Sequence, residues 1–177
     1  MEQQDIRWKQ RFQNFDKAFL RLSKAMLIIR EDPDNFLLQA GLIQIYEFTF
    51  ELSWKTLKDY LEAEGFTCPS PRATLRQAFQ SGYIQEGDLW LQALNDRNLT
   101  THTYDEETAL SVANNIQTSY FPLLKALHTW LEIQSHDYGL HRDIRKSSIG
   151  SFPDIRMSRK QSYSVREPKA ITNPVQI

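Results

Sequence analysis

The sequence has little of several things that would point to a disulfide-bonded, zinc-binding or membrane protein. Its 177 residues include one cysteine, Cys68, which excludes an internal disulfide bond, and one thiol with four scattered histidines forms no zinc pattern. The N-terminal residues MEQQDIRWKQ lack the apolar run of a signal peptide. No apolar stretch approaches the roughly 20 residues that a membrane helix needs. We therefore expect a cytoplasmic protein that does not span a membrane and holds no metal.

Charge is balanced over the whole chain but not within its parts. The formal net charge is −1, from 21 Lys and Arg against 22 Asp and Glu. Residues 138–177 hold 8 of the basic and 3 of the acidic residues, so residues 1–137 keep 13 against 19, a net charge of −6. An acidic body has no broad electrostatic surface for nucleic acid, so any contact with RNA should be local.

Apolar residues recur at helical spacing along residues 1–137. In the first pattern, over about 3–30, Trp8, Phe12, Phe15, Phe19, Leu22 and Met26 share one face. A second pattern runs from Asn35 to Gly65 and includes Leu38, Leu42, Ile45, Phe48 and Leu52. Two short helices are expected at about 71–81 and from about residue 86, then a long one at about 106–134 that Pro122 bends. Since no run alternates with period two, the fold class predicted is all-α, an antiparallel up-and-down bundle of four to five helices in a single domain.

A junction between two of these helices carries three groups that can handle a phosphate. The stretch RNLTTHTYDE places Arg97, His102 and Tyr104 within eight positions. A structural interpretation is available for each: Arg97 pairs with Asp96 or Glu106, His102 caps the helix C-terminus, and Tyr104 packs into the core. From the residue types alone this structural interpretation is favoured, because isolated His and Arg residues are usually structural or solvated.

The order of these residues resembles a known motif. The string R-N-x-x-x-H-x-Y-D, formed by Arg97, Asn98, His102, Tyr104 and Asp105, resembles the signature of HEPN-domain proteins. More closely it resembles the branch called nucleotidyltransferase substrate-binding proteins or HepT-like toxins of HepT/MntA toxin–antitoxin systems. An R-x4-H match is weak by itself, and the helical context makes it more specific.

The resemblance extends over roughly residues 5–137 and includes the stretch YEFTFELSWKTLKDYL of the second long pattern. It implies a helical bundle that forms a homodimer, with the Arg and His of both protomers gathered in a cleft. Active members of this branch are metal-independent ribonucleases. The resemblance further implies a cognate minimal nucleotidyltransferase, the antitoxin, which uses ATP to add AMP to the motif tyrosine, here Tyr104. The protein itself would need no cofactor.

The residue types suit that chemistry. Cutting RNA without a metal requires a base for the 2′-hydroxyl proton and a cation for the charge that grows on the phosphoryl oxygens. His102 can titrate near neutral pH and Arg97 keeps its charge, so we assign His102 as the general base or acid and Arg97 as the phosphate clamp. AMP on Tyr104 would then block RNA by its bulk and its charge.

Three further residues are weaker candidates. Asn98 could orient Arg97 or the phosphate, and a capping role is equally compatible with the sequence. Glu47 and Glu51 could line the cleft, but a solvated helix face is the stronger interpretation for both.

Residues 138–177 form a tail that is predicted to be disordered, because it has no lasting periodicity and is rich in Ser, Arg and Pro. Its last 16 residues, SYSVREPKAITNPVQI, can be back-translated with ordinary codons and read two bases later as LFGSRAKGNYKPGSD. That reading resembles the phosphate-gripping opening of a minimal nucleotidyltransferase. We interpret the tail as a frame-shifted remnant of a neighbouring nucleotidyltransferase gene, a hypothesis that the DNA of the locus tests directly.

Three functions remain open at this point. The first is a ribonuclease toxin that uses Arg97 and His102, and the second is a non-catalytic subunit that presents a substrate to the nucleotidyltransferase. The third is a helical dimerisation module in which the motif only holds the junction. The intact Arg, His and Tyr favour the first. The aromatic face of the first helix and a motif that needs two copies favour a homodimer.

Overall fold

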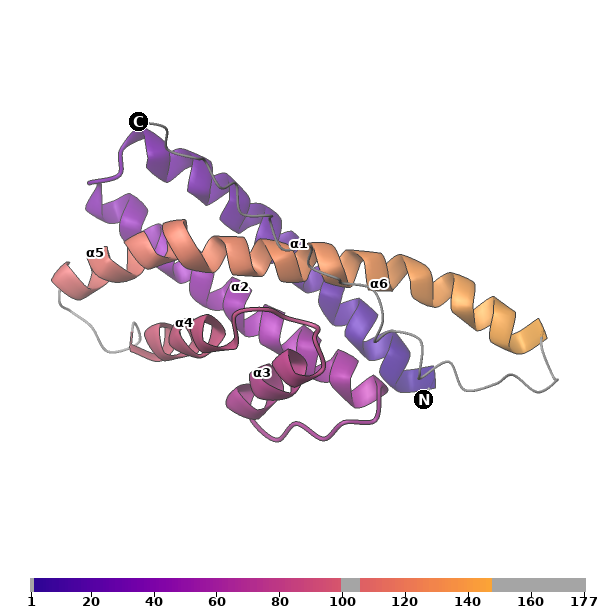
Figure 1. The fold of residues 1–177 in the computed structure, drawn as a ribbon. Helices are drawn as coiled ribbons and strands as arrows, with labels where there is room; N and C mark the ends of the chain where they lie inside the picture. The colour runs from indigo at the N-terminus through magenta and orange to yellow at the C-terminus, as the bar shows by residue number, and fades with distance from the viewer. Residues whose placement is uncertain (1, 100–105, 148–177) are drawn as a thin grey trace, which may run out of the picture. The chain divides into compact units, whose positions relative to one another are not determined.

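A computed structural model describes residues 2–99 and 106–147 of the chain, and all of its regular elements there are helical (Figure 1). The order is α1 (Glu2–Glu31), α2 (Phe36–Ala63), α3 (Pro71–Gln80), α4 (Gly87–Leu99), α5 (Glu106–Asn115), a π-helical turn η2 (Ile116–Tyr120) and α6 (Phe121–Ser147). The all-α prediction is confirmed. No helix in the described ranges is both long enough and apolar enough to cross a membrane.

The chain divides into two units, Met1–Leu140 and His141–Ile177, and the description below concerns the first. Residues 138–147 were expected to be disordered with the tail, but α6 includes them and ends at Ser147. The sequence offers no proline between Pro122 and Pro153 to stop the helix, and a single interior glycine costs only about 1 kcal/mol.

The helix ends follow local sequence signals. Asn35 caps α2, because its side-chain oxygen accepts hydrogen bonds from the backbone N–H groups of Leu37 and Leu38. Ser70 caps α3 in the same way, directly before Pro71. Gly65 and Gly82 follow α2 and α3 with φ of 92° and 73°, a conformation that favours glycine.

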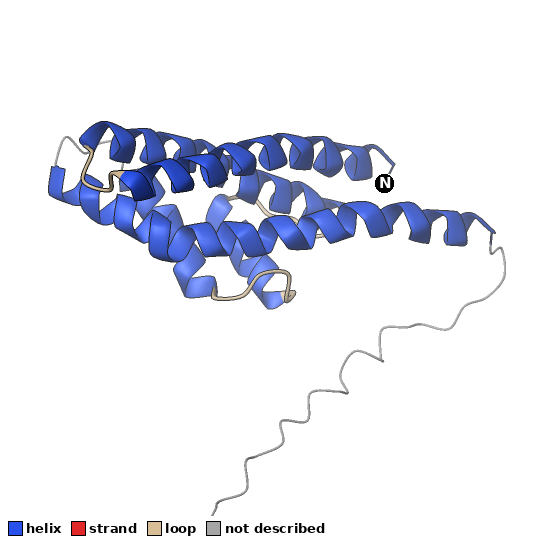
Figure 2. Cartoon of the chain, turned by 90° about the horizontal axis from the view of Figure 1, so that it is seen from above, coloured by secondary structure: helices blue, strands red, loops and turns tan. Residues whose placement is uncertain are grey.

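Helices α1 and α2 run antiparallel and pack along their length (Figures 1 and 2). The aromatic face predicted for the first helix is confirmed as core, since all of its predicted members are buried: Trp8, Phe12, Phe15, Phe19, Leu22 and Met26. On α2 the prediction was less accurate. Phe48 is 53% exposed, and the residues that enter the core include Tyr46, Phe50 and Leu57. Because α2 is apolar on most sides, periodicity alone did not identify its buried face.

Helix α6 closes the core through aromatic contacts with α1 and α2. Phe19 of α1 stacks on Phe121 with ring centroids 5.6 Å apart, and Tyr60 of α2 meets Trp130 edge-on at 5.0 Å. His128 lies against Phe19, and its Nε2 is 2.8 Å from Oδ1 of Asp16. These contacts fix α6 within the bundle, and with it the turn that precedes it.

The long helix expected over 106–134 is interrupted by η2. Pro122 does not end the helix, as expected, but the irregularity is a π-helical turn directly before it, where the N–H of Phe121 donates to the carbonyl of Ile116. Proline lacks an N–H and crowds the carbonyl four residues earlier, which disfavours regular α-helical bonding in the preceding turn. Gln117 and Thr118 donate side-chain hydrogen bonds to the carbonyls of Ala113 and Asn114 in this segment.

Candidate functional site

Arg97 and Asn98 lie in the last turn of α4, where the sequence analysis placed them. Nη1 of Arg97 donates to Oδ1 of Asn98 at 3.2 Å. His102, Tyr104 and Asp105 lie outside the described residues, within the six positions between α4 and α5. The structure therefore fixes the first half of the motif.

The carboxylate of Glu51 on α2 forms an ion pair with Arg97. Nη2 of Arg97 is 3.2 Å from Oε2 of Glu51, and the two side chains are 33% and 28% exposed. The structural interpretation from sequence had paired Arg97 with Asp96 or Glu106. Asp96 accepts hydrogen bonds from Tyr120 and Asn115, and the side chain of Glu106 lies outside the described residues. Glu51, which the sequence placed on a solvated face, pairs with the motif arginine.

Glu51 also contacts two side chains of its own helix, α2. Its carboxylate also accepts from Nζ of Lys55 at 2.8 Å and from Nε1 of Trp54 at 3.0 Å. Partial burial is the largest influence on the pKa of Glu51 and raises it. The hydrogen bonds from Lys55 and Trp54 and the charge of Arg97 together outweigh burial, so the pKa is lowered. Glu51 is thus held as a carboxylate facing Arg97.

Asp96, the neighbour of Arg97, is hydrogen-bonded to α5 and η2. Its Oδ2 accepts a hydrogen bond from the hydroxyl of Tyr120 in η2 and another, at 3.2 Å, from Nδ2 of Asn115 in α5. Burial, followed by the hydrogen bond to Asp96, raises the pKa of the Tyr120 phenol. Tyr120 is almost wholly buried, whereas Asp96 is partly exposed.

A second buried tyrosine contacts α4 one turn earlier. The hydroxyl of Tyr46 donates to the carbonyl oxygen of Ala93 at 3.0 Å, and its ring stacks on Tyr120 at 5.7 Å. Burial raises the pKa of Tyr46 well above its ordinary value, with further contributions from Tyr120 and Asp96. Successive residues of α4 therefore have different roles: Asp96 is bound to α5 and η2, and Arg97 faces Glu51 at the surface.

Sequence reasoning missed Tyr120 and Asn115 as members of this junction, and it did not identify them as partners of Asp96. Tyr120 and Asn115 lie 24 and 19 residues from Asp96, and no motif links them. The only available signal was Pro122, which marks the place where helix geometry is disturbed.

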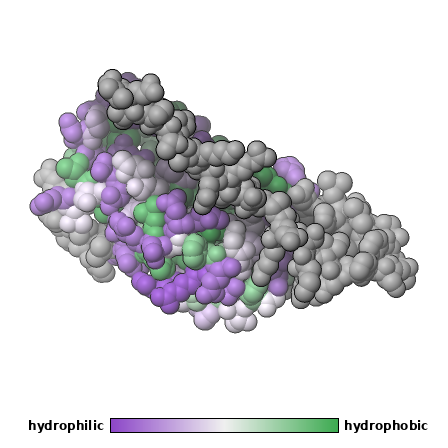
Figure 3. Space-filling view, viewed as in Figure 1, coloured by the Kyte–Doolittle hydropathy of each residue, from purple (hydrophilic) through white to green (hydrophobic). Residues whose placement is uncertain are grey.

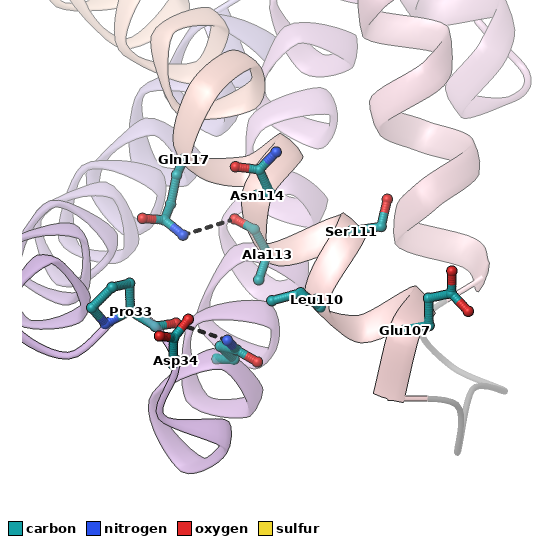
Figure 4. Close-up of a pocket in the computed structure, with 9 residues that line it drawn as sticks. Pro33, Asp34, Glu107, Leu110, Ser111, Ala113, Asn114 and Gln117 are labelled. Atoms are coloured by element: carbon teal, nitrogen blue, oxygen red, sulfur yellow. Dashed lines mark hydrogen bonds between the residues drawn. The ribbon is translucent and has the colours of Figure 1, made fainter.

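A shallow hollow of about 450 Å³ lies beside α5, between it and the turn that joins α1 to α2 (Figure 4). Its charged residues are Asp34 and Glu107, and its other polar side chains include Ser111, Asn114 and Gln117. Two carboxylates repel a phosphate, so this hollow does not suit a nucleotide or RNA. Within the described ranges, no group of three or more His, Cys, Asp or Glu is arranged to hold a metal ion.

The chain is similar to known proteins in sequence and in fold. A curated protein of Haemophilus influenzae (strain Rd), "Probable ribonuclease HepT", is 38% identical over a 110-residue match that covers 55% of this chain and 75% of that protein. A crystal structure from Thermus thermophilus matches with a TM-score of 0.58 and 31% identity, covering 64% of this chain and 94% of that one.

A second solved structure, from Haemophilus influenzae, is described as revealing the fold of a substrate binding domain of a nucleotidyltransferase. It matches with a TM-score of 0.60 and 28% identity, covering 68% of this chain and 98% of that one. The model of the family described as "Nucleotidyltransferase substrate binding protein like" matches residues 10–133. Because this match includes most of α1, all of α2 to α5 and most of the core-forming part of α6, the chain belongs to the nucleotidyltransferase substrate binding protein like family.

Proposed function

We propose that this protein is a HepT-like, metal-independent endoribonuclease in which Arg97 and His102 act on RNA. The single observation that carries the proposal is the motif arginine at the end of α4, partly exposed and paired with the Glu51 carboxylate. The similarity to a protein named "Probable ribonuclease HepT" supports it.

The proposed reaction uses the 2′-hydroxyl of the RNA as the nucleophile. His102 takes its proton, the 2′-oxygen attacks the adjacent phosphorus, and the bond from phosphorus to the 5′-oxygen breaks. A protonated group, His102 of a second copy or water, then gives a proton to the leaving 5′-oxygen. Arg97 stabilises the negative charge on the non-bridging oxygens, and Asn98 helps to orient its guanidinium.

The Glu51 contact gives Arg97 a resting partner that an RNA phosphate can replace. A partly exposed ion pair contributes little stability, about 0–1 kcal/mol, so exchanging the carboxylate for a phosphate has a small cost. Guanidinium groups bind both anions with the same two-pronged geometry. Glu51 thus holds Arg97 in place without blocking its use.

The partner in this proposal is a minimal nucleotidyltransferase that transfers AMP from ATP to the hydroxyl of Tyr104. The oxygen of Tyr104 attacks the α-phosphorus, pyrophosphate leaves, and the phenol proton passes to solvent. Support comes from the family to which the chain belongs and from the tyrosine two residues after His102. The added phosphate would compete with RNA for Arg97.

A homodimer is part of the proposal, but the surface that would form its interface differs from the one expected from the sequence. The aromatic face of α1 that suggested it is buried within the protomer and cannot form an interface. Other large apolar side chains lie at the surface and are available for one, among them Leu20, Leu27, Leu37 and Phe48, and apolar groups are visible among polar ones in Figure 3. Light scattering at micromolar concentration should give twice the mass of the 20.8 kDa chain.

The second candidate function is a non-catalytic substrate-binding subunit of a nucleotidyltransferase. The family description and the Haemophilus influenzae structure favour it. In that case the purified protein binds the nucleotidyltransferase and raises its activity but cuts no RNA.

Incubation of the purified protein with labelled RNA, with and without EDTA, separates these functions. We expect cleavage in both conditions, and none with Arg97→Ala or His102→Ala, although both variants remain helical by circular dichroism. Lys24→Ala, an exposed residue on α1, is the matched control for loss of a surface charge. Wild-type protein that leaves RNA intact would exclude the ribonuclease and favour the binding subunit.

Intact-mass spectrometry tests the regulation. Wild type incubated with ATP and the nucleotidyltransferase should gain mass in steps of AMP, whereas Tyr104→Phe should gain none and keep its ribonuclease activity. An unmodified wild type with a demonstrably active partner enzyme would remove Tyr104 from the proposal.

A further inference from the structure

We propose that Asp96, Tyr120 and Asn115, brought together by the π-helical turn η2, form a positioning device that sets the place of Arg97 for catalysis. The inference deepens the ribonuclease function proposed above and rests on it. None of the three residues is assigned a direct contact with RNA. They act by fixing the last turn of α4, from which Arg97 extends.

The π-helical turn has a geometric consequence for this contact. Asn115 and Tyr120 are five residues apart, and a regular α-helix would place their side chains about 140° apart, on different faces. In a π-helix the hydrogen bond runs from residue i to i+5, so residues five apart lie above one another. Both side chains accordingly donate to the same atom, Oδ2 of Asp96.

The device is anchored in the core. The Tyr120 ring is buried and stacks on Tyr46, and Tyr46 donates to the carbonyl of Ala93. In a regular α-helix that carbonyl also accepts the backbone N–H of the residue four positions later, which is Arg97. The turn that carries Arg97 is thus bound from α2 through Ala93 and from α5 and η2 through Asp96.

Neighbouring residues on α4 point about 100° apart, so a fixed Asp96 fixes the direction in which Arg97 leaves the helix. The Arg97 side chain then reaches Glu51 across the junction. Catalytic groups lose activity steeply when displaced, and a shift of about 1 Å can reduce a rate about 10²-fold. The hydrogen bonds of Asp96 therefore help to keep Arg97, the proposed phosphate clamp, at a fixed position relative to the rest of the motif.

Tyr120→Phe tests the device, because it removes one hydroxyl and keeps the buried ring. We expect kcat for RNA cleavage to fall about tenfold with little change in KM, the pattern of an interaction that matters in the transition state. Tyr60→Phe is the matched control, since it removes a hydroxyl from another buried tyrosine that bonds Gln134 of α6 instead of α4. An equal fall in both variants, or a change confined to KM, would overturn the positioning role.

Two substitutions of Asp96 form a second test of the inference. Asp96→Asn keeps one oxygen that can accept from both Tyr120 and Asn115, whereas Asp96→Leu keeps the approximate volume and accepts nothing. The inference expects kcat within about threefold of wild type for Asn and a fall of at least about tenfold for Leu. Equal loss in the two variants would show that the charge of Asp96, not its hydrogen bonds, is what matters, and would overturn the inference as stated.

Hydrogen exchange keeps this test separate from that of the ribonuclease itself. The amides of Asp96, Arg97 and Asn98 should exchange about tenfold faster in Tyr120→Phe than in wild type or Tyr60→Phe, whether or not RNA is cut. If exchange is faster in Tyr120→Phe but the wild-type protein cuts no RNA, the three residues do position the end of α4 and the proposed ribonuclease function is excluded. Unchanged exchange in a protein that cuts RNA would exclude the device alone.

Discussion

Two clusters of arginine and carboxylate side chains hold this protein's helices, and they differ in burial. In the Asp59 cluster, Asp59 of α2 accepts from Arg7 at 2.7 Å and from Arg11 at 2.5 Å, and Arg7 also pairs with Glu62. In the Arg97 pair, one arginine meets Glu51 at 3.2 Å. The Asp59 side chain is 5% exposed and that of Glu51 is 28% exposed.

The difference separates a structural contact from one that can be exchanged. A buried carboxylate must keep its cations, since losing one leaves an uncompensated charge away from water. A carboxylate that water reaches can release its arginine at small cost. The Asp59 cluster therefore joins α1 to α2, while the Arg97 pair is partly exposed beside the motif. Three of the following four predictions test this contrast, and all four run from the largest expected effect to the smallest.

Asp59→Ala should lower the free energy of unfolding by about 2–3 kcal/mol. This is less than the ~3–5 kcal/mol of a wholly buried pair, because Arg7 and Arg11 are partly exposed. Urea denaturation measures it, with Glu62→Ala as the control of smaller effect. A loss below about 0.5 kcal/mol would place Asp59 in the same class as Glu51.

Stability should fall at alkaline pH because of Tyr46 and Tyr120. Both phenols have raised pKa values in the folded protein, so the unfolded chain ionises first and unfolding releases protons. The contribution is complete below pH 10.0, the ordinary value, and is lost above it by roughly 1.4 kcal/mol per pH unit for each tyrosine. The free energy of unfolding, measured by urea denaturation at several pH values between about 8 and 11, should fall less steeply with pH in Tyr120→Phe than in wild type. The same dependence on pH in both proteins would contradict the raised pKa of Tyr120.

Glu51→Gln should lower stability by less than about 1 kcal/mol at low salt, and the difference from wild type should disappear in about 1 M NaCl. The loss in Asp59→Ala should persist at the same salt concentration, because burial shields that cluster from screening. Parallel urea titrations at two salt concentrations make the comparison. A Glu51 effect that survives high salt would mean that the Arg97 pair is structural.

The smallest effect concerns acid pH. The pKa of Glu51 is lowered from 4.5 in the folded protein, so its contribution is present above about that pH and is lost as pH falls through the lower folded value. Given its exposure, the contribution is a few tenths of a kcal/mol. The stability difference between wild type and Glu51→Gln should therefore shrink as the pH falls below the ordinary glutamate pKa of 4.5, and a difference that stays constant on acidification would contradict this.

Local sequence was sufficient for the helices and for one face of the core. Asn35 and Ser70 cap helices through their own side chains, and Gly65 and Gly82 adopt positive φ, so these ends depend on a few neighbouring residues. The face of α1 was readable because its aromatic residues alternate with charged ones. The sequence did not predict that α6 extends beyond residue 137. The composition of residues 138–177 is an average over the whole tail, and a helix continues until it meets a residue that breaks it.

The sequence by itself also determined which residues carry the candidate chemistry, since Arg97, Asn98, His102 and Tyr104 lie within one short stretch. Only the tertiary structure decided what Arg97 and its neighbour contact. Glu51 lies 46 positions before Arg97, and Tyr120 lies 24 after Asp96, where a π-helical turn rotates it toward that carboxylate. Pairing at such separations depends on how whole helices pack and rotate, which is set by the burial of many apolar side chains together and is not encoded in the spacing of any motif.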